Sequence, residues 1–144
     1  MKNTAEIISL LFFLGALLPP FWGLYMIRLD SKLIINRIFL LLSLALSVWM
    51  LGFAMANSQS TVEVALLWRR FAAIGWTSIF SLILHFFLLI TADSRESTFC
   101  KFRPLLYIPS LILMFVFSFS NKMSAVQYNL IKVDTGWINS VVNN

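Results

Sequence analysis

Charged side chains are scarce in this chain, and the scarcity excludes most soluble folds. Only 12% of its 144 residues are Asp, Glu, Lys or Arg, whereas 60% are hydrophobic and the mean hydropathy is +0.86. Soluble domains carry about 25% charged residues. The sequence therefore predicts an integral membrane protein whose main partner is the lipid bilayer.

Cysteine and histidine are rarer still than charged residues. Cys100 is the only cysteine, so no internal disulfide and no CxxC motif can form. His85 is the only histidine, and one imidazole with no Asp, Glu or Cys within a helical turn does not make a metal site. We therefore expect no metal and no cofactor.

Catalytic motifs are missing as well. The sequence contains no HExxH, GxSxG, Walker or GxGxxG pattern, and its 6 acidic residues all fall in predicted loops or at helix ends. No predicted span contains the lysine that opsin-type retinal binding requires. We expect no enzyme activity in these residues. The net charge of +5 lies in short connections between apolar runs, which argues against a nucleic-acid partner.

What the chain has in abundance is long apolar runs. They predict an all-α fold, a polytopic transmembrane helix bundle in which residues 1–144 form one domain. The predicted spans are 7–27, 38–56, 68–91 and 104–120. Residues 121–144 contain no run able to span, and we expect them to form an extended or interfacial outer loop before a further helix that this fragment does not include.

The basic residues predict the orientation. Six Lys and Arg residues lie in the connections 28–37 and 93–103, against five on the other side. If Arg69 and Arg70 are counted with the end of their helix, the ratio becomes six to three. The N-terminus is then expected outside.

Three prolines fall inside predicted spans. Pro19 and Pro20 lie in the first span and Pro109 in the fourth, and each predicts a kink because proline lacks an N–H and clashes with the preceding turn. Membrane helices tolerate this where a neighbour satisfies the freed carbonyls. A packing kink and a ligand-binding break are both compatible with the pattern.

The second span gathers small and polar residues on one face. Asn36, Ser43, Ser47, Ala54 and Ser58 lie within about 60° of one another at helical spacing. Such faces let helices approach closely and hydrogen-bond across. We interpret Ser43 and Ser47 as packing residues, together with Gly75 of the third span.

The third span carries a polar wall. Arg70, Ser78, Ser81 and His85 lie within about a quarter-turn, whereas Arg69 points the opposite way. In hydrocarbon this wall must face other helices or a hydrated cavity. His85 is then either hydrogen-bonded between helices or a signalling and proton-sensing group.

The outer end of this span is the predicted place for a ligand. Trp68 fits an aromatic belt, and Arg70 either snorkels to the headgroups or lines an outward-facing cavity that holds an anionic ligand group. Trp68, Arg70, Ser78, Ser81 and His85 are therefore the candidates for ligand binding or signalling.

Two stretches resemble a known family. The Trp68-Arg69 start, Gly75 and the close LHFFLLITAD resemble the third helix of the seven-transmembrane sensor region at the N-terminus of bacterial histidine kinases and some diguanylate cyclases. The stretch SVWMLGFAMA is similar to its second helix. The resemblance covers residues 33–93, and four of the seven helices are present.

The resemblance implies a multi-pass protein of the bacterial cytoplasmic membrane, with its N-terminus outside. It also implies that three further helices lead to a cytoplasmic kinase or cyclase and that the full-length protein is a homodimer. We therefore expect a sensory input module of a two-component or related system that responds to a small-molecule ligand or a membrane signal. The alternatives are a fragment of a secondary transporter and a small structural membrane protein.

Overall fold

The computed structural model describes residues 2–91, 103–120 and 128–139. Three long helices come first, α1 (Lys2–Leu29), α2 (Ile34–Ser58) and α3 (Val62–Thr91). A fourth helical segment consists of the 3₁₀ helix η1 (Arg103–Tyr107), α5 (Ile108–Met114) and the π-helical turn η2 (Phe115–Phe119). The predicted helical fold is confirmed. Cys100 and most of the connection 93–103 lie outside the described residues.

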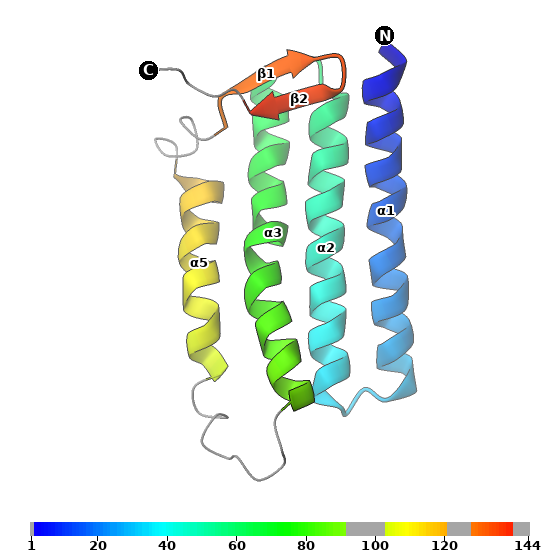
Figure 1. Ribbon diagram of the computed structural model, residues 1–144, viewed down its shortest axis with the longest axis vertical. Coiled ribbons are helices and arrows are strands. Elements are labelled where there is room, and N and C mark those ends of the chain that lie inside the picture. Colours follow the sequence, from blue (N-terminus) through cyan, green and yellow to red (C-terminus); the bar gives the residue numbers. More distant parts are fainter. Residues whose placement is uncertain (1, 92–102, 121–127, 140–144) are drawn as a thin grey trace.

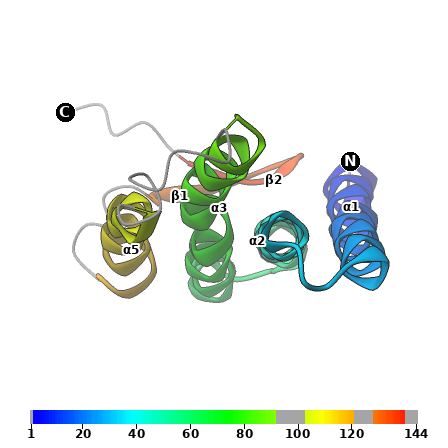
Figure 2. The ribbon, with the colours of Figure 1, turned by 90° about the horizontal axis from the view of Figure 1, so that it is seen from below.

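The helices stand side by side in a single row, in the order α1, α2, α3 and α5, and each packs against its neighbour (Figures 1 and 2). A single row leaves two faces of each helix uncovered, and many large apolar side chains are exposed there, such as Leu18 and Phe80. By length and composition, α1, α2 and α3 can each cross a membrane, and the apolar helical segment Pro104–Phe119 is shorter. These features are those of a membrane protein.

The first helix runs through Pro19 and Pro20 without a break, and the kink expected there stays a prediction. Pro20 has no N–H, and the Ala16 carbonyl therefore lacks its usual donor within the helix. The Ser47 hydroxyl of α2 donates a hydrogen bond to that carbonyl at 2.6 Å. The Ser47 hydroxyl of α2 thus replaces the N–H donor that Pro20 lacks. The helix α1 is continuous over its full length.

Pro109 lies within the fourth helical segment, as the sequence predicts. It occupies the first turn of α5, where an N–H has no intrahelical acceptor to lose. It therefore marks the passage from η1 to α5, and the kink expected there stays a prediction.

The second and third helices approach closely at two glycines. A Cβ on Gly52 would lie 2.6 Å from the Cβ of Ala72, and one on Gly75 would lie 2.5 Å from the carbonyl oxygen of Ala45. Neither position has room for a side chain. The α2 and α3 backbones are therefore in direct contact along this seam, as expected for a packing role of Gly75.

A β-hairpin follows the fourth helical segment, and the sequence analysis did not predict it. Strand β1 (Leu130–Val133) pairs antiparallel with β2 (Gly136–Asn139), and Asp134 and Thr135 form the turn. The hairpin lies across the ends of α2 and α3, at the same end as the N-terminus (Figure 1). The described part of the predicted outer loop thus includes two paired strands, and its interfacial position stays a prediction.

Candidate functional site

The hairpin is attached to the helices through Trp137. Its main-chain N–H donates to Asn57 Oδ1 at 3.3 Å, and its indole N–H donates to the Gln59 carbonyl at 3.0 Å. Its own carbonyl accepts a hydrogen bond from the Arg69 guanidinium. Trp137 therefore joins β2 to the end of α2 and to the side of α3.

Apolar packing supports the same contact. Trp137 and Leu130 are buried against Ala65 of α3, with Tyr128 packed beside them. Gly136 has a φ of +119°, which favours glycine, and a Cβ there would lie 2.9 Å from the Asn57 side chain. The hairpin is thus fitted closely onto the helix ends.

Arg69 is the charged group at the centre of this region. Its side chain is only 8% exposed, and its guanidinium carbon lies 3.9 Å from the centre of the Phe53 ring. Its Nε–H is buried and makes no hydrogen bond with any described residue. A buried cation is costly unless it is paired, so the unpaired Nε–H of Arg69 marks a group that an acceptor would stabilise.

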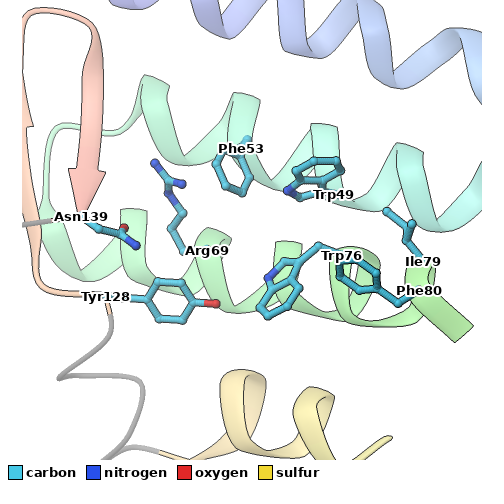
Figure 3. A pocket seen from close by; sticks show the side chains of 8 residues that line it. All are labelled: Trp49, Phe53, Arg69, Trp76, Ile79, Phe80, Tyr128 and Asn139. Atoms are coloured by element: carbon cyan, nitrogen blue, oxygen red, sulfur yellow. The ribbon is translucent and has the colours of Figure 1, made fainter. Parts of the chain in front are cut away.

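A cavity of about 320 Å³ lies beside Arg69, between α2, α3 and the hairpin (Figure 3). Its walls are mainly aromatic and are formed by Trp49, Phe53, Trp76, Phe80 and Tyr128. Arg69 and Asn139 lie at the hairpin end, and Ile79 lies at the far end with Phe80. The cavity therefore has one polar end and one apolar end, and its volume is in the range of small-molecule sites.

Tyr128 forms the wall next to the hairpin. Its hydroxyl points toward Trp76 (Figure 3), and the Phe117 ring lies 6.3 Å from its own. Burial raises the pKa of the Tyr128 phenol, and the Trp76 side chain and the charges of Arg69 and Arg70 partly oppose that rise. Tyr128 is therefore neutral at physiological pH and presents a hydroxyl to the cavity region.

Trp68 and Arg70, the predicted ligand residues near the hairpin end of α3, are not those that line this cavity. Arg69 lines it, whereas neither Arg70 nor Trp68 belongs to its described lining. Arg70 lies on the side of the fourth segment, where its main-chain carbonyl accepts a hydrogen bond from Ser118 at 3.1 Å. The cavity is thus on the face opposite the polar wall, because the hairpin covers the Arg69 side.

The polar wall itself meets the fourth helical segment. Ser81 donates to the Leu106 carbonyl at 2.6 Å, and the Ser110 hydroxyl lies 2.5 Å from Ser81 Oγ. His85 Nδ1 shares a hydrogen bond of 2.6 Å with the Tyr107 hydroxyl. Ser81 and His85 are therefore brought together as a polar link between α3 and its neighbour.

The remaining predicted serines bond to main-chain carbonyls, two within their own helix and one in a neighbouring helix. Ser78 donates to Ile74 within α3, and Ser43 donates to Phe39 within α2. Ser47 bonds across to α1, as described above. The described residues contain no group of three or more His, Cys, Asp or Glu side chains that could hold a metal ion.

Two signals in the sequence point to parts of the site but not to their docking on one another. The stretch LIKVDTGWIN has two short apolar runs separated by a turn that ends in glycine, which is typical of a hairpin. Arg69 has a tryptophan seven residues further on, and two helical turns place both on one face. Comparison of the chain with family models, with curated proteins and with solved structures finds no significant match.

Proposed function

We propose that this chain is the membrane-embedded sensory input module of a signal-transducing receptor. A small molecule enters the cavity beneath the hairpin, changes the packing of α2 and α3, and so passes a signal to an output domain outside these residues. One observation carries the proposal: α2, α3 and the hairpin jointly form a cavity with aromatic walls and a buried guanidinium. A ligand there contacts all three elements at once.

The membrane arrangement is part of the proposal. Residues 7–27, 38–56, 68–91 and 104–120 span a bacterial cytoplasmic membrane, with the N-terminus and the hairpin outside. Exposed apolar side chains on both faces of the helix row support it, because they need a lipid environment. The basic connection 28–37, at the opposite end from the hairpin, also supports it.

The seam between α2 and α3 provides a route for the signal. Gly52 and Gly75 hold the two backbones in direct contact, so a ligand that wedges Trp49 from Trp76 has to be accommodated by a shift along this seam. Helices that pack through small residues rearrange at modest cost, and a ligand that prefers one packing increases its population. In the full-length protein, which we propose to be a homodimer, this shift reaches the output domain.

The alternative is a fragment of a secondary transporter, which the prolines expected to kink the first and fourth helices favour. The structure shows α1 continuous through Pro19 and Pro20. Discontinuous helices are the usual source of substrate sites at the membrane midplane. The cavity described here lies instead near one end of the helix row, beneath the hairpin.

The test is the coding sequence beyond residue 144 and the activity of its product. We expect three more spans followed by a kinase with a phosphoacceptor helix, or by a cyclase. The full-length protein in proteoliposomes should then change its output activity when Trp76→Ala alters the cavity, and Phe87→Ala, on an exposed part of α3, should not have this effect. Eight further spans with repeat symmetry would refute the sensor assignment.

A further inference from the structure

Arg69 has no anionic partner for its guanidinium among the described residues. Its guanidinium is 8% exposed, yet its one hydrogen bond to a described residue is to the neutral carbonyl of Trp137. Its Nε–H has no partner among the described residues. The described lining of the cavity contains no carboxylate to balance this charge. Charge-assisted bonds from arginine to a carboxylate are roughly twice as strong as neutral ones, so an anionic oxygen is the preferred partner.

The walls define the rest of the ligand. Beyond Arg69 the cavity continues between the rings of Trp49, Trp76 and Phe80 (Figure 3). Arg69 and Phe80 are separated along α3 by roughly 16 Å at the rise of an α-helix. Flat apolar groups stack favourably on such aromatic surfaces. A ligand with an anionic head at the hairpin end and a flat apolar body matches this division.

The one charged group in the described lining favours an anion with a single charge. Arg69 supplies one positive charge and the aromatic walls supply none, so a dianion would bring a buried negative charge that nothing in the described lining compensates. A cationic ligand would be repelled by the guanidinium, even though aromatic rings attract cations elsewhere. A neutral apolar ligand would leave the Nε–H unpaired.

We propose that the cavity binds a small monocarboxylate with an aromatic or similarly flat apolar body, held by Arg69 through its carboxylate. This inference rests on the proposed function, since it names the ligand class of the same site. The carboxylate accepts from the guanidinium beside the Trp137 carbonyl, and the apolar body lies between α2 and α3. Binding thereby ties the hairpin to the helix seam through one side chain.

The experiment compares two probes of the same shape. The full chain is placed in nanodiscs of neutral phosphatidylcholine and titrated by calorimetry with 2-naphthoate and with the uncharged 2-naphthamide. We expect 2-naphthoate to bind about tenfold more tightly or better, which corresponds to one charge-assisted hydrogen bond. Equal binding of the two probes, or no binding of either, would overturn the proposal.

Variants test whether Arg69 causes the preference for 2-naphthoate over 2-naphthamide. Arg69→Gln should remove the preference for the charged probe, and Arg37→Gln should retain it, because Arg37 is an exposed arginine bonded to Ser31 at the opposite end of α2. Should Arg69→Gln fail to fold, Arg69→Lys keeps the charge and loses the planar donor pair, and we expect it to weaken 2-naphthoate binding while 2-naphthamide binding is unchanged. A preference that survives Arg69→Gln would contradict the proposal.

A lipid is the other source of an anionic amphiphile. The titration is therefore repeated in nanodiscs that contain phosphatidylglycerol, and we expect the affinity for 2-naphthoate to be unchanged. Loss of binding in that membrane would show that a lipid phosphate occupies the site and would overturn the small-molecule assignment. Failure of this inference is distinguishable from failure of the proposed function, because the output of the full-length protein would still respond to Trp76→Ala.

Discussion

Ser47 of α2 donates a hydrogen bond of 2.6 Å to the carbonyl of Ala16 in α1, the group that Pro20 leaves without a helical donor. Two features that look independent in the sequence, a proline pair and a serine face, are therefore one structural unit. The Ser47 hydroxyl joins α2 to α1 at the carbonyl that the proline leaves without a donor, so it should stabilise the chain more than an ordinary interhelical serine does.

This unit predicts a thermodynamic coupling between Ser47 and Pro20. Ser47→Ala should destabilise the chain by about 1 kcal/mol when Pro20 is present. In a Pro20→Ala background the Ala16 carbonyl regains its helical donor, and the same change should cost roughly 0.5 kcal/mol less. Unfolding titrations of the four variants in detergent measure the difference. Ser43→Ala, whose hydroxyl bonds to its own helix, is the control and should show no coupling.

The contact between α2 and α3 predicts that Gly75 does not tolerate a side chain. In Gly75→Ala the new Cβ would lie 2.5 Å from the Ala45 carbonyl oxygen and 2.6 Å from the Trp49 nitrogen. Both are backbone atoms, so the helices must separate, at a cost of about 1–3 kcal/mol.

Gly15→Ala is the matched control, because its new Cβ would meet only the flexible Met50 side chain at 3.2 Å. Thermal unfolding of the two variants in the same detergent should show a loss for Gly75→Ala and little change for Gly15→Ala. Equal stability of the two variants would mean that the α2–α3 seam is looser than described.

Asn57 is predicted to hold the hairpin on the helix ends. Asn57→Ala removes the acceptor of the Trp137 main-chain N–H and the surface against which Gly136 packs. We expect the free energy of local opening of residues 128–139 to fall by about 1 kcal/mol. Hydrogen exchange there should then be roughly fivefold faster. Ser58→Ala, which removes an exposed hydroxyl next along the chain, should leave the exchange unchanged.

Burial of Tyr128 predicts a titration at high pH. Its phenol pKa is raised above the ordinary value of 10.0 when the hairpin is docked, so the docked form holds its proton more tightly than the open form. Docking is therefore unaffected below pH 10 and weakens as the pH rises through the raised pKa. The absorbance of tyrosinate, taken as the difference between wild type and Tyr128→Phe, should have its midpoint above 10. A midpoint at or below 10 would show that the Tyr128 ring is exposed to water and would contradict its burial.

The sequence predicts the helical architecture well and the site only in outline. Long apolar runs indicate helices directly, so the three long helices lie where the hydropathy predicts them. Helix α3 begins at Val62, six residues before the predicted span. Ser81 and His85 face another helix, as a polar wall in an apolar environment requires.

The place of Arg69 in the cavity lining could not be predicted in the same way. A helical projection separates its face from the polar wall, but it does not say which face is covered. The cover comes from the hairpin, whose docking depends on Trp137 contacts with residues about 70 to 80 positions earlier in the chain. No local pattern encodes a contact over that separation, so the choice between Arg69 and Arg70 needed the folded chain.

The most direct test of the central claim is hydrogen exchange of the full chain in neutral nanodiscs, with and without saturating 2-naphthoate. The account predicts slower exchange in two separate stretches, the hairpin residues 128–139 and the part of α3 around Arg69, because one ligand contacts both. Unchanged exchange in the hairpin at saturation, or protection confined to the Ser81 and His85 contact with the fourth segment, would contradict it.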